Sequence, residues 1–277
     1  MAPREAGGEG LSPEAVAMAR MLGAALFFQG LACVRRTPLP AKEDLWRLLG
    51  LSALGITLNQ MLFLSGLKRT TPFAAALLGV VIPAATVLLA ALFGKERLTL
   101  RTASGLAVAG IGVVYLTGLH TVDVGALLVF VNCFLYAAYL VFSRDIIQRL
   151  GALVVITWIF TLGAISFAPL GGPALLAALP TLTTRGASFF AYVVAVPTIL
   201  AYLLNAWALG RTTPTVVTVY IHLQPVLAGV LAWIQLGAGL SERMVIASLF
   251  ILVGVVIVVF RPVVAGAPDR RDPDVSR

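Results

Sequence analysis

The sequence predicts an all-α polytopic membrane protein built from two inverted repeats. Its 277 residues are 60% hydrophobic and 12% charged, whereas about a quarter of the residues in a soluble domain are charged. Apolar stretches of about 20 residues, the length that crosses a bilayer as a helix, follow one another along the chain. The alternating segments of about 10 residues that are typical of a membrane β-barrel are not found.

Two parts of the sequence match in register, 142 residues apart. Arg69-Thr70-Thr71-Pro72 opens one apolar run, and Arg211-Thr212-Thr213-Pro214 opens the other. Further along, Gly112-Val113-Val114 corresponds to Gly254-Val255-Val256. A repeat carried by membrane-length apolar runs is typical of transporters built from two related halves.

Nine apolar runs are expected to span the membrane, and the breaks between them hold nearly all of the charge. In chain order they are Ala15–Val34, Leu48–Leu67, Pro72–Phe93, Thr102–Leu119, Val124–Phe142, Leu153–Leu170, Ala187–Leu209, Pro214–Leu236 and Met244–Phe260. We expect Thr71 and Thr213 to cap the helices that follow them, with Pro at the first helical position. Pro83 and Pro225 lie at matching depth in two spans and are hinge candidates, because a proline inside a helix frees a carbonyl and bends the helix.

The Lys and Arg residues of the loops indicate the orientation. With the loop from Arg35 to Arg47 in the cytoplasm, the cytoplasmic segments hold most of the basic residues. The N-terminus is then outside and the C-terminus cytoplasmic, and the third and eighth spans run in opposite directions. The first repeat is expected over residues 1–121 and the second over 122–262, followed by a disordered cytoplasmic tail at 263–277.

The composition argues against several other functions. The net charge of +8 comes from basic residues scattered through short loops, so positive-inside bias explains it better than binding to nucleic acid does. Cys33 and Cys133 lie alone in separate spans and form no redox or metal motif. No hydrolase, metalloprotease or nucleotide-binding motif is found, and the Asp and Glu residues lie outside the span interiors. We therefore expect no catalysis, no cofactor and no metal.

Polar and aromatic side chains form stripes along four of the expected spans. Such side chains cost free energy when they face lipid, so we expect them to point into the helix bundle. Hydrogen bonds between helices would explain each residue alone, whereas a shared cavity would explain the stripes together. The substrate-binding candidates are Asn59, Gln60, Asn132, Tyr136, Tyr202, Asn205, His222 and Gln224. Arg20 lies within two turns of its helix end, so we expect it to reach the membrane surface and to have a structural role.

Residues 58–116 carry a more specific pattern. They contain an Asn-bearing helix, a mid-helix proline, a Gly-x-Glu-Arg loop with Glu96, and a Gly-rich closing helix. The order and spacing of these features resemble the EamA family of the drug/metabolite transporter superfamily. The second copy, from Ala201 to Phe260, follows the pattern more loosely and has Ala238 where the first has Glu96.

The resemblance implies ten helices in two inverted halves that carry small metabolites across a membrane. Because Leu11 onward resembles the family's second helix, the family's helix one is expected to be missing from this chain. The leading hypothesis is a secondary transporter, an exporter or permease of small organic metabolites that works by alternating access in the inner (cytoplasmic) membrane. The alternatives are an inactive or non-transporting truncated protein that acts as an interaction partner and, less favoured, an intramembrane enzyme. The expected partners are a small-molecule substrate and the lipid bilayer, and a homodimer is left open.

Overall fold

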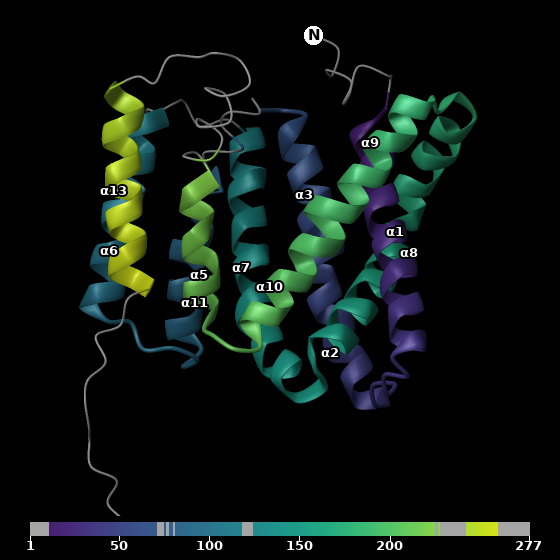
Figure 1. Ribbon diagram of the computed structural model, residues 1–277, viewed down its shortest axis with the longest axis horizontal. Coiled ribbons are helices and arrows are strands. Elements are labelled where there is room, and N and C mark those ends of the chain that lie inside the picture. Colours follow the sequence, from purple (N-terminus) through teal and green to yellow (C-terminus); the bar gives the residue numbers. More distant parts are fainter. Residues whose placement is uncertain are drawn as a thin grey trace, which may run out of the picture.

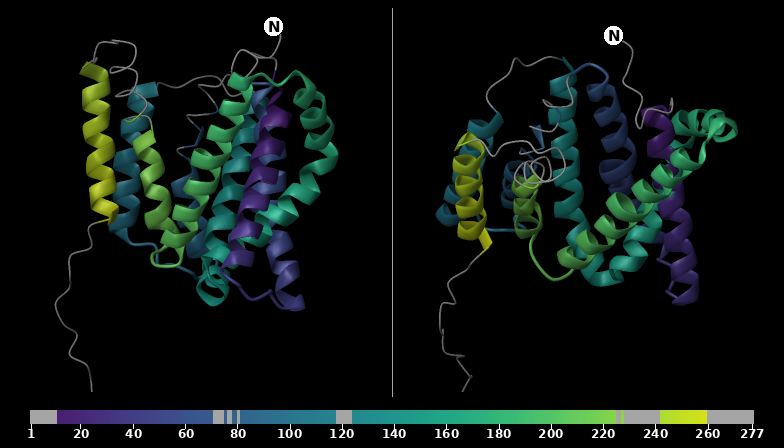
Figure 2. Two further views of the ribbon diagram at one scale, coloured as in Figure 1. Left: turned by 45° about the vertical axis from the view of Figure 1, so that its right-hand side comes forward. Right: turned by 45° about the horizontal axis from the view of Figure 1, so that its top comes forward.

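Most helices of the computed structural model are aligned in one bundle, and the helix labelled α9 and α10 crosses the others obliquely (Figures 1 and 2). The structure describes residues 11–70, 75, 78–79, 81–117, 124–224, 227 and 242–259. In chain order the elements are α1 (Pro13–Val34), α2 (Lys42–Ser52), η1 (Ala53–Thr57), α3 (Leu58–Leu67), α5 (Val81–Leu92), α6 (Leu100–Thr117), α7 (Val124–Leu150), α8 (Ala152–Ala178), η2 (Leu179–Thr181), α9 (Thr184–Val194), η3 (Ala195–Leu200), α10 (Ala201–Leu209), α11 (Pro214–Val219), η4 (Tyr220–Leu223) and α13 (Glu242–Val259).

Five helical segments in the described part of the chain are long and apolar enough to cross a membrane. They are Pro13–Val34, Lys42–Leu67, Val124–Leu150, Ala152–Thr181 and Thr184–Leu209. Shorter apolar helices cover Val81–Leu92, Pro214–Leu223 and Val245–Val258. Each expected span contains a described helix, which confirms the helical membrane fold, and the count of nine crossings stays a prediction.

Several helices extend further than the apolar stretches predicted, and α2 and α7 are two of them. α2 begins at Lys42 rather than at Leu48, and α7 continues to Leu150 rather than ending at Phe142. The added turns carry charged side chains that find partners: Arg149 in the last turn of α7 makes a two-pronged ion pair with Asp44 in the first turn of α2. A helix therefore continues past the hydrocarbon boundary where its charged end is satisfied.

The second Thr-Pro pair starts a helix as predicted. The hydroxyl of Thr213 accepts a hydrogen bond from the backbone N–H of Val216 at 3.4 Å, and Pro214 is the first residue of α11. Thr71, the corresponding residue of the first copy, lies outside the described residues. Thr213 therefore confirms the capping prediction for the second copy.

Pro83 stands in the first turn of α5, which begins at Val81. The carbonyl of Gly79 accepts a hydrogen bond from the N–H of Ile82 at 3.1 Å, which satisfies the carbonyl that a proline at position 83 would leave free. A proline in a first turn starts a helix rather than bending it, so the structure differs from the expected mid-helix kink. A hinge role for Pro83 stays a prediction, and Pro225 lies outside the described residues.

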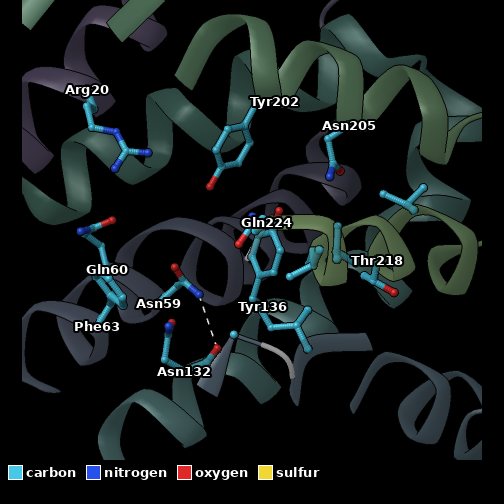
Figure 3. Close-up of a pocket in the computed structure, with 15 residues that line it drawn as sticks. Arg20, Asn59, Gln60, Phe63, Asn132, Tyr136, Tyr202, Asn205, Thr218 and Gln224 are labelled. Carbon is cyan, nitrogen blue, oxygen red and sulfur yellow. Dashed lines mark hydrogen bonds between the residues drawn. The ribbon is translucent and has the colours of Figure 1, made fainter. Parts of the chain in front are cut away.

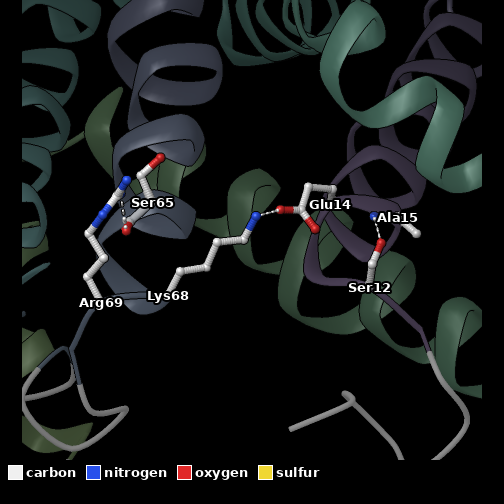
Figure 4. A network of polar contacts seen from close by, with 6 residues as sticks. All are labelled: Ser12, Glu14, Ala15, Ser65, Lys68 and Arg69. Atoms are coloured by element: carbon white, nitrogen blue, oxygen red, sulfur yellow. Dashed lines mark hydrogen bonds and ion pairs between the residues drawn. The ribbon is translucent and has the colours of Figure 1, made fainter. Parts of the chain in front are cut away.

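Polar contacts fasten the N-terminal end of α1 (Figure 4). Ser12 caps the helix by accepting a hydrogen bond from the N–H of Ala15 at 3.2 Å. Glu14 in the first turn forms an ion pair with Lys68, which directly follows α3. These contacts hold the start of α1 beside the end of α3.

The three-dimensional structure repeats with the spacing of the sequence repeat. Lys42–Leu67 and Thr184–Leu209 are both 26 residues long, and α6 and α13 are both 18 residues long. In each pair the second member begins 142 residues after the first. Both 26-residue spans contain a short π-helical segment, η1 in the first and η3 in the second, at the corresponding place.

The packing of α6 against α13 shows that the repeats are inverted (Figure 1). A Cβ at Gly254 would lie 2.5 Å from the carbonyl oxygen of Gly105, and a Cβ at Gly112 would lie 2.8 Å from that of Ala247. Gly105 corresponds to Ala247 in the repeat, and Gly112 corresponds to Gly254, so each contact is the counterpart of the other. Two helices that run antiparallel about a two-fold axis produce this pairing, as the sequence predicted.

Contacts between aromatic rings join α1 of the first repeat to α8 and α10 of the second. Phe28 on α1 and Phe160 on α8 are buried, with ring centroids 5.7 Å apart. Phe160 also meets Tyr202 of α10 edge to face, with centroids 4.8 Å apart. The core therefore fixes the position of Tyr202.

Candidate functional site

A cavity of about 460 Å³ opens among α1, α3, α7, α10 and α11 (Figure 3). This volume lies within the range of small-molecule sites, roughly 300–1,000 Å³. Its polar lining comes from helices of both repeats and comprises Arg20, Asn59, Gln60, Asn132, Tyr136, Tyr202, Asn205, Thr218 and Gln224. All of the predicted substrate-binding candidates except His222 therefore lie around one cavity.

Corresponding positions of the two repeats meet in this cavity. Gln60 corresponds to Tyr202, and Phe63 corresponds to Asn205, and all four side chains line the wall. Gln60 and Tyr202 lie about two helical turns before the ends of their helices, at Leu67 and Leu209. Inversion brings these positions to the middle of the bundle from opposite directions.

The π-helical segment η3 positions Arg20 of α1. Pro197 in η3 has no N–H, so it leaves the carbonyl of Val193, four residues earlier, without its helical donor. The hydroxyl of Thr198 donates to that carbonyl at 2.7 Å. The oxygen of the same hydroxyl accepts a hydrogen bond from Nε of Arg20 at 2.8 Å. The irregular turn in η3 therefore holds the guanidinium group of α1 in place.

The π-helical segment η1 positions the tyrosines of α7. Gly55, which corresponds to Pro197 in the repeat, lies against the ring of Tyr139, and a Cβ there would be 2.6 Å from ring carbons. Tyr139 is fully buried, and its ring centroid is 5.8 Å from that of Tyr136, which lines the cavity. Single-turn π segments inside α-helices occur frequently at functional sites, and here one lies next to the cavity in each repeat.

Asn59 and Asn132 join α3 to α7 beside the cavity. The Nδ2 group of Asn59 donates to the backbone carbonyl of Asn132 at 3.5 Å, as Figure 3 shows. Asn132 is 8% exposed, and its Oδ1 atom is buried with no hydrogen-bond partner in the described part of the chain. A buried acceptor without a donor is costly, so this amide oxygen is an unsatisfied group that lies beside the cavity and is not exposed to it.

His222 and Gln224 lie in different surroundings, although the sequence grouped them. Gln224 is exposed at the cavity. His222 is 2% exposed and is absent from the cavity wall, and its Nδ1 atom donates to the carbonyl of Val219 at 3.2 Å. The structure therefore brings Gln224 to the site and leaves His222 in the packing of η4.

Sequence reasoning missed Arg20 as a cavity residue. The prediction that it would reach the membrane surface is wrong, because its guanidinium is bound to Thr198 and lines the cavity. A signal was present: Ala17 and Ala24, which share a helix face with Arg20, are small and buried. Small residues on one face indicate a neighbouring helix there, which places Arg20 inside the bundle.

The comparisons agree with this structure. The model of the EamA-like transporter family matches residues 5–118 and again 123–260. YdfC of Bacillus subtilis (strain 168), named an uncharacterized transporter, is 25% identical over 239 residues, which cover 84% of this chain and 77% of YdfC. The WAT1-related protein At4g30420 of Arabidopsis thaliana is 46% identical over 56 residues, 20% of this chain and 15% of that protein.

A solved structure, titled only as the crystal structure of a protein, has the same fold. It superposes with a TM-score of 0.72 at 18% identity, over 89% of this chain and 87% of its own. The family model covers most of the sequence in two copies, and the described helices form the inverted bundle expected of such a transporter. The chain therefore belongs to the EamA-like transporter family.

Proposed function

We propose that the protein is a secondary transporter that carries small organic metabolites across the cytoplasmic (inner) membrane by alternating access. The observation that carries the proposal is the cavity itself, whose amide, hydroxyl and aromatic side chains come from both inverted repeats. In carriers with inverted repeats, the substrate site lies between the repeats near the bilayer midplane. Gln60 and Tyr202, which are repeat counterparts, both line one such wall.

Polar contacts between the repeats support a gate at one end of the bundle. Lys95 forms an ion pair with Asp145, Oε1 of Glu96 accepts from the N–H of Thr215 at 3.2 Å, and Nε of Arg101 donates to the carbonyl of Ile257 at 2.6 Å. Each contact joins the first repeat to the second. The first two contacts, which join the segment after α5 to α7 and α11, would have to break for the cavity to open toward this end. The positive-inside rule assigns this end to the cytoplasm along with the C-terminus.

Flux into proteoliposomes tests the proposal. A panel of labelled small neutral, anionic and cationic metabolites is offered to vesicles that contain the purified protein, and to empty vesicles. We expect protein-dependent uptake of at least one solute, because the cavity can enclose one. Tyr202→Phe should lower that uptake several-fold, since it removes one hydrogen-bonding group of the wall. Tyr192→Phe is the matched control, because Tyr192 lies 59% exposed on the same long helix, away from the cavity.

Two results would contradict the proposal. Equal uptake by protein-containing and empty vesicles across the whole panel would favour the non-transporting interaction partner. Equal effects of Tyr202→Phe and Tyr192→Phe on an observed flux would mean that transport does not pass through this cavity.

A further inference from the structure

The cavity has a charged residue that the proposed transport of unspecified metabolites does not explain. Arg20 is the one charged side chain on its described wall. Glu14, the acidic residue nearest to it in sequence, is already paired with Lys68. The positive charge of Arg20 therefore lies at the cavity without a carboxylate from the described part of the protein.

The hydrogen bond from Nε to Thr198 also fixes the orientation of the guanidinium group of Arg20. Nε donates to Thr198, and no hydrogen bond or ion pair of the two terminal nitrogens exists among the described residues. In Figure 3 the guanidinium of Arg20 and the hydroxyl of Tyr202 both point into the space beside Gln60. The two terminal nitrogens form the parallel N–H pair that matches the two oxygens of a carboxylate.

A purely structural role for Arg20 explains less of this geometry. A neutral donor would suffice to bond Thr198, whereas an arginine inside a membrane helix is costly and normally pairs with an opposite charge or with backbone carbonyls. Placed at a cavity with its terminal nitrogens free, Arg20 can receive an anionic partner from outside the protein.

Resting on the transport function proposed above, we propose that Arg20 binds an anionic group of the substrate, and that the substrates are small carboxylates. The remaining wall suits the rest of such a molecule. Asn59, Gln60 and Asn205 offer amide groups to a hydroxyl or amino substituent, and Tyr136 and Phe63 offer rings to its carbon skeleton. The group that Arg20 recognises is a pair of anionic oxygens on a soluble molecule.

Matched acids and amides test the assignment, because each pair differs in charge and hardly in shape. The probes are lactate and lactamide, phenylacetate and phenylacetamide, and succinate and succinamide, added to the purified full chain in detergent at neutral pH while its thermal unfolding is followed. We expect at least one acid to raise the Tm and its amide to leave the Tm unchanged. Arg20→Gln should weaken binding of that acid by about tenfold or more and abolish the preference for it. Arg185→Gln, at an exposed arginine at a helix end, should change neither.

Two further variants separate binding from tethering. Arg20→Lys keeps the charge without the two-pronged geometry, so it should prefer the acid with weaker affinity; this variant carries the test if Arg20→Gln does not fold. Thr198→Val removes the anchor, so it should lower affinity and keep the preference for acid over amide. The proposal would be overturned if Thr198→Val and Arg20→Lys both lost the preference for acid over amide, as Arg20→Gln does. Arg20 would then act only by joining α1 to η3 through Thr198.

The remaining outcomes also decide the matter. Equal Tm shifts from acid and amide in every pair, or no shift from any acid, would overturn the carboxylate assignment. Repeating the titration in phosphatidylcholine nanodiscs with and without phosphatidylglycerol should give the same acid binding, whereas displacement of the acid by the anionic lipid would assign Arg20 to a lipid headgroup. Protein-dependent flux of a neutral solute that Arg20→Gln leaves unchanged would overturn this inference and leave the transport function standing.

Discussion

The spans Lys42–Leu67 and Thr184–Leu209 are the same element of the fold in two different settings. They have the same length and a π segment at the same place, and they supply Gln60 and Tyr202 from corresponding positions. Yet Gly55 in the first π segment corresponds to Pro197 in the second. One segment is held by a tyrosine ring that packs on a glycine, and the other by a proline that removes a helical hydrogen bond. The backbone form is common to both repeats, while different residues maintain it.

The two spans differ most in what covers them. In Lys42–Leu67, 39% of the apolar window is buried, against 11% in Thr184–Leu209. Both α8 and α7 contribute to this difference. α8 packs on α2 and η1, where the hydroxyl of Ser52 donates to the carbonyl of Ile159. α7 packs along α3, where Asn59 bonds to it and Gly66 approaches its backbone. The counterparts of these two residues are Ala201 and Ala208, and Ala201 is exposed. The repeats are therefore symmetric in their helices and asymmetric in their surroundings, and the cavity between them has unlike walls.

The strongest break of the symmetry is expected where the two closing helices touch. Gly254→Val should lower the free energy of unfolding by about 1–3 kcal/mol or prevent assembly, because its Cβ would meet the backbone of α6 at 2.5 Å. Thermal unfolding of the purified protein measures this. Gly112→Val, at the counterpart position, should behave alike, and Gly110→Val, with nothing within 4 Å of its Cβ, should be nearly silent. Similar losses for Gly110→Val and Gly254→Val would contradict the packing.

A smaller effect is expected from replacing the residues that maintain the two π segments, Gly55 in η1 and Pro197 in η3. Gly55→Ala should destabilise the protein by about 1–2 kcal/mol, since the ring of Tyr139 must shift from 2.6 Å. Pro197→Ala should cost less, because it restores an N–H that competes with Thr198 for the carbonyl of Val193. It should instead reduce the affinity for a bound solute, because the anchor of Arg20 loosens. Unfolding and ligand titration of the two variants separate these effects, and a larger stability loss for Pro197→Ala would reverse the interpretation.

The smallest effect is expected at the edge of the cavity. Gln224→Ala should lower transport by a few-fold, the value of about one hydrogen bond, with protein abundance unchanged. His222→Ala should act on the Tm rather than on the flux per folded molecule, because His222 is buried in η4 and away from the cavity. Flux normalised to folded protein compares the two, and a larger loss of normalised flux in His222→Ala would place His222 in the pathway.

Local chemistry explains what the sequence could predict. Membrane-length apolar runs give the helices, the register of the two RTTP copies predicts a repeat, and the odd number of spans between the copies together with the charge of the loops predicts its inversion. Polar residues inside spans must point away from lipid, so most of the cavity wall follows from their spacing. The small residues beside Arg20 could have placed it inside the bundle, but the sequence could not identify its partner Thr198, which lies 178 residues away and depends on a π turn that periodicity does not reveal. His222 is absent from the cavity wall, in a 3₁₀ segment whose three residues per turn differ from the 3.6-residue period of the sequence argument, and its role in substrate handling stays a prediction.

Accessibility of the cavity from each side of the membrane is the most direct test of transport between inverted repeats. Val217 lines the cavity, so Val217→Cys, in a chain with Cys33 and Cys133 replaced by Ser, offers a single thiol there. We expect an impermeant charged thiol reagent to modify it from either face of sealed vesicles, at rates that a transported solute changes in opposite directions. Val196→Cys, on the exposed side of η3 and away from the cavity, should show no solute dependence. Modification of Val217→Cys from one face alone under every condition would contradict alternating access.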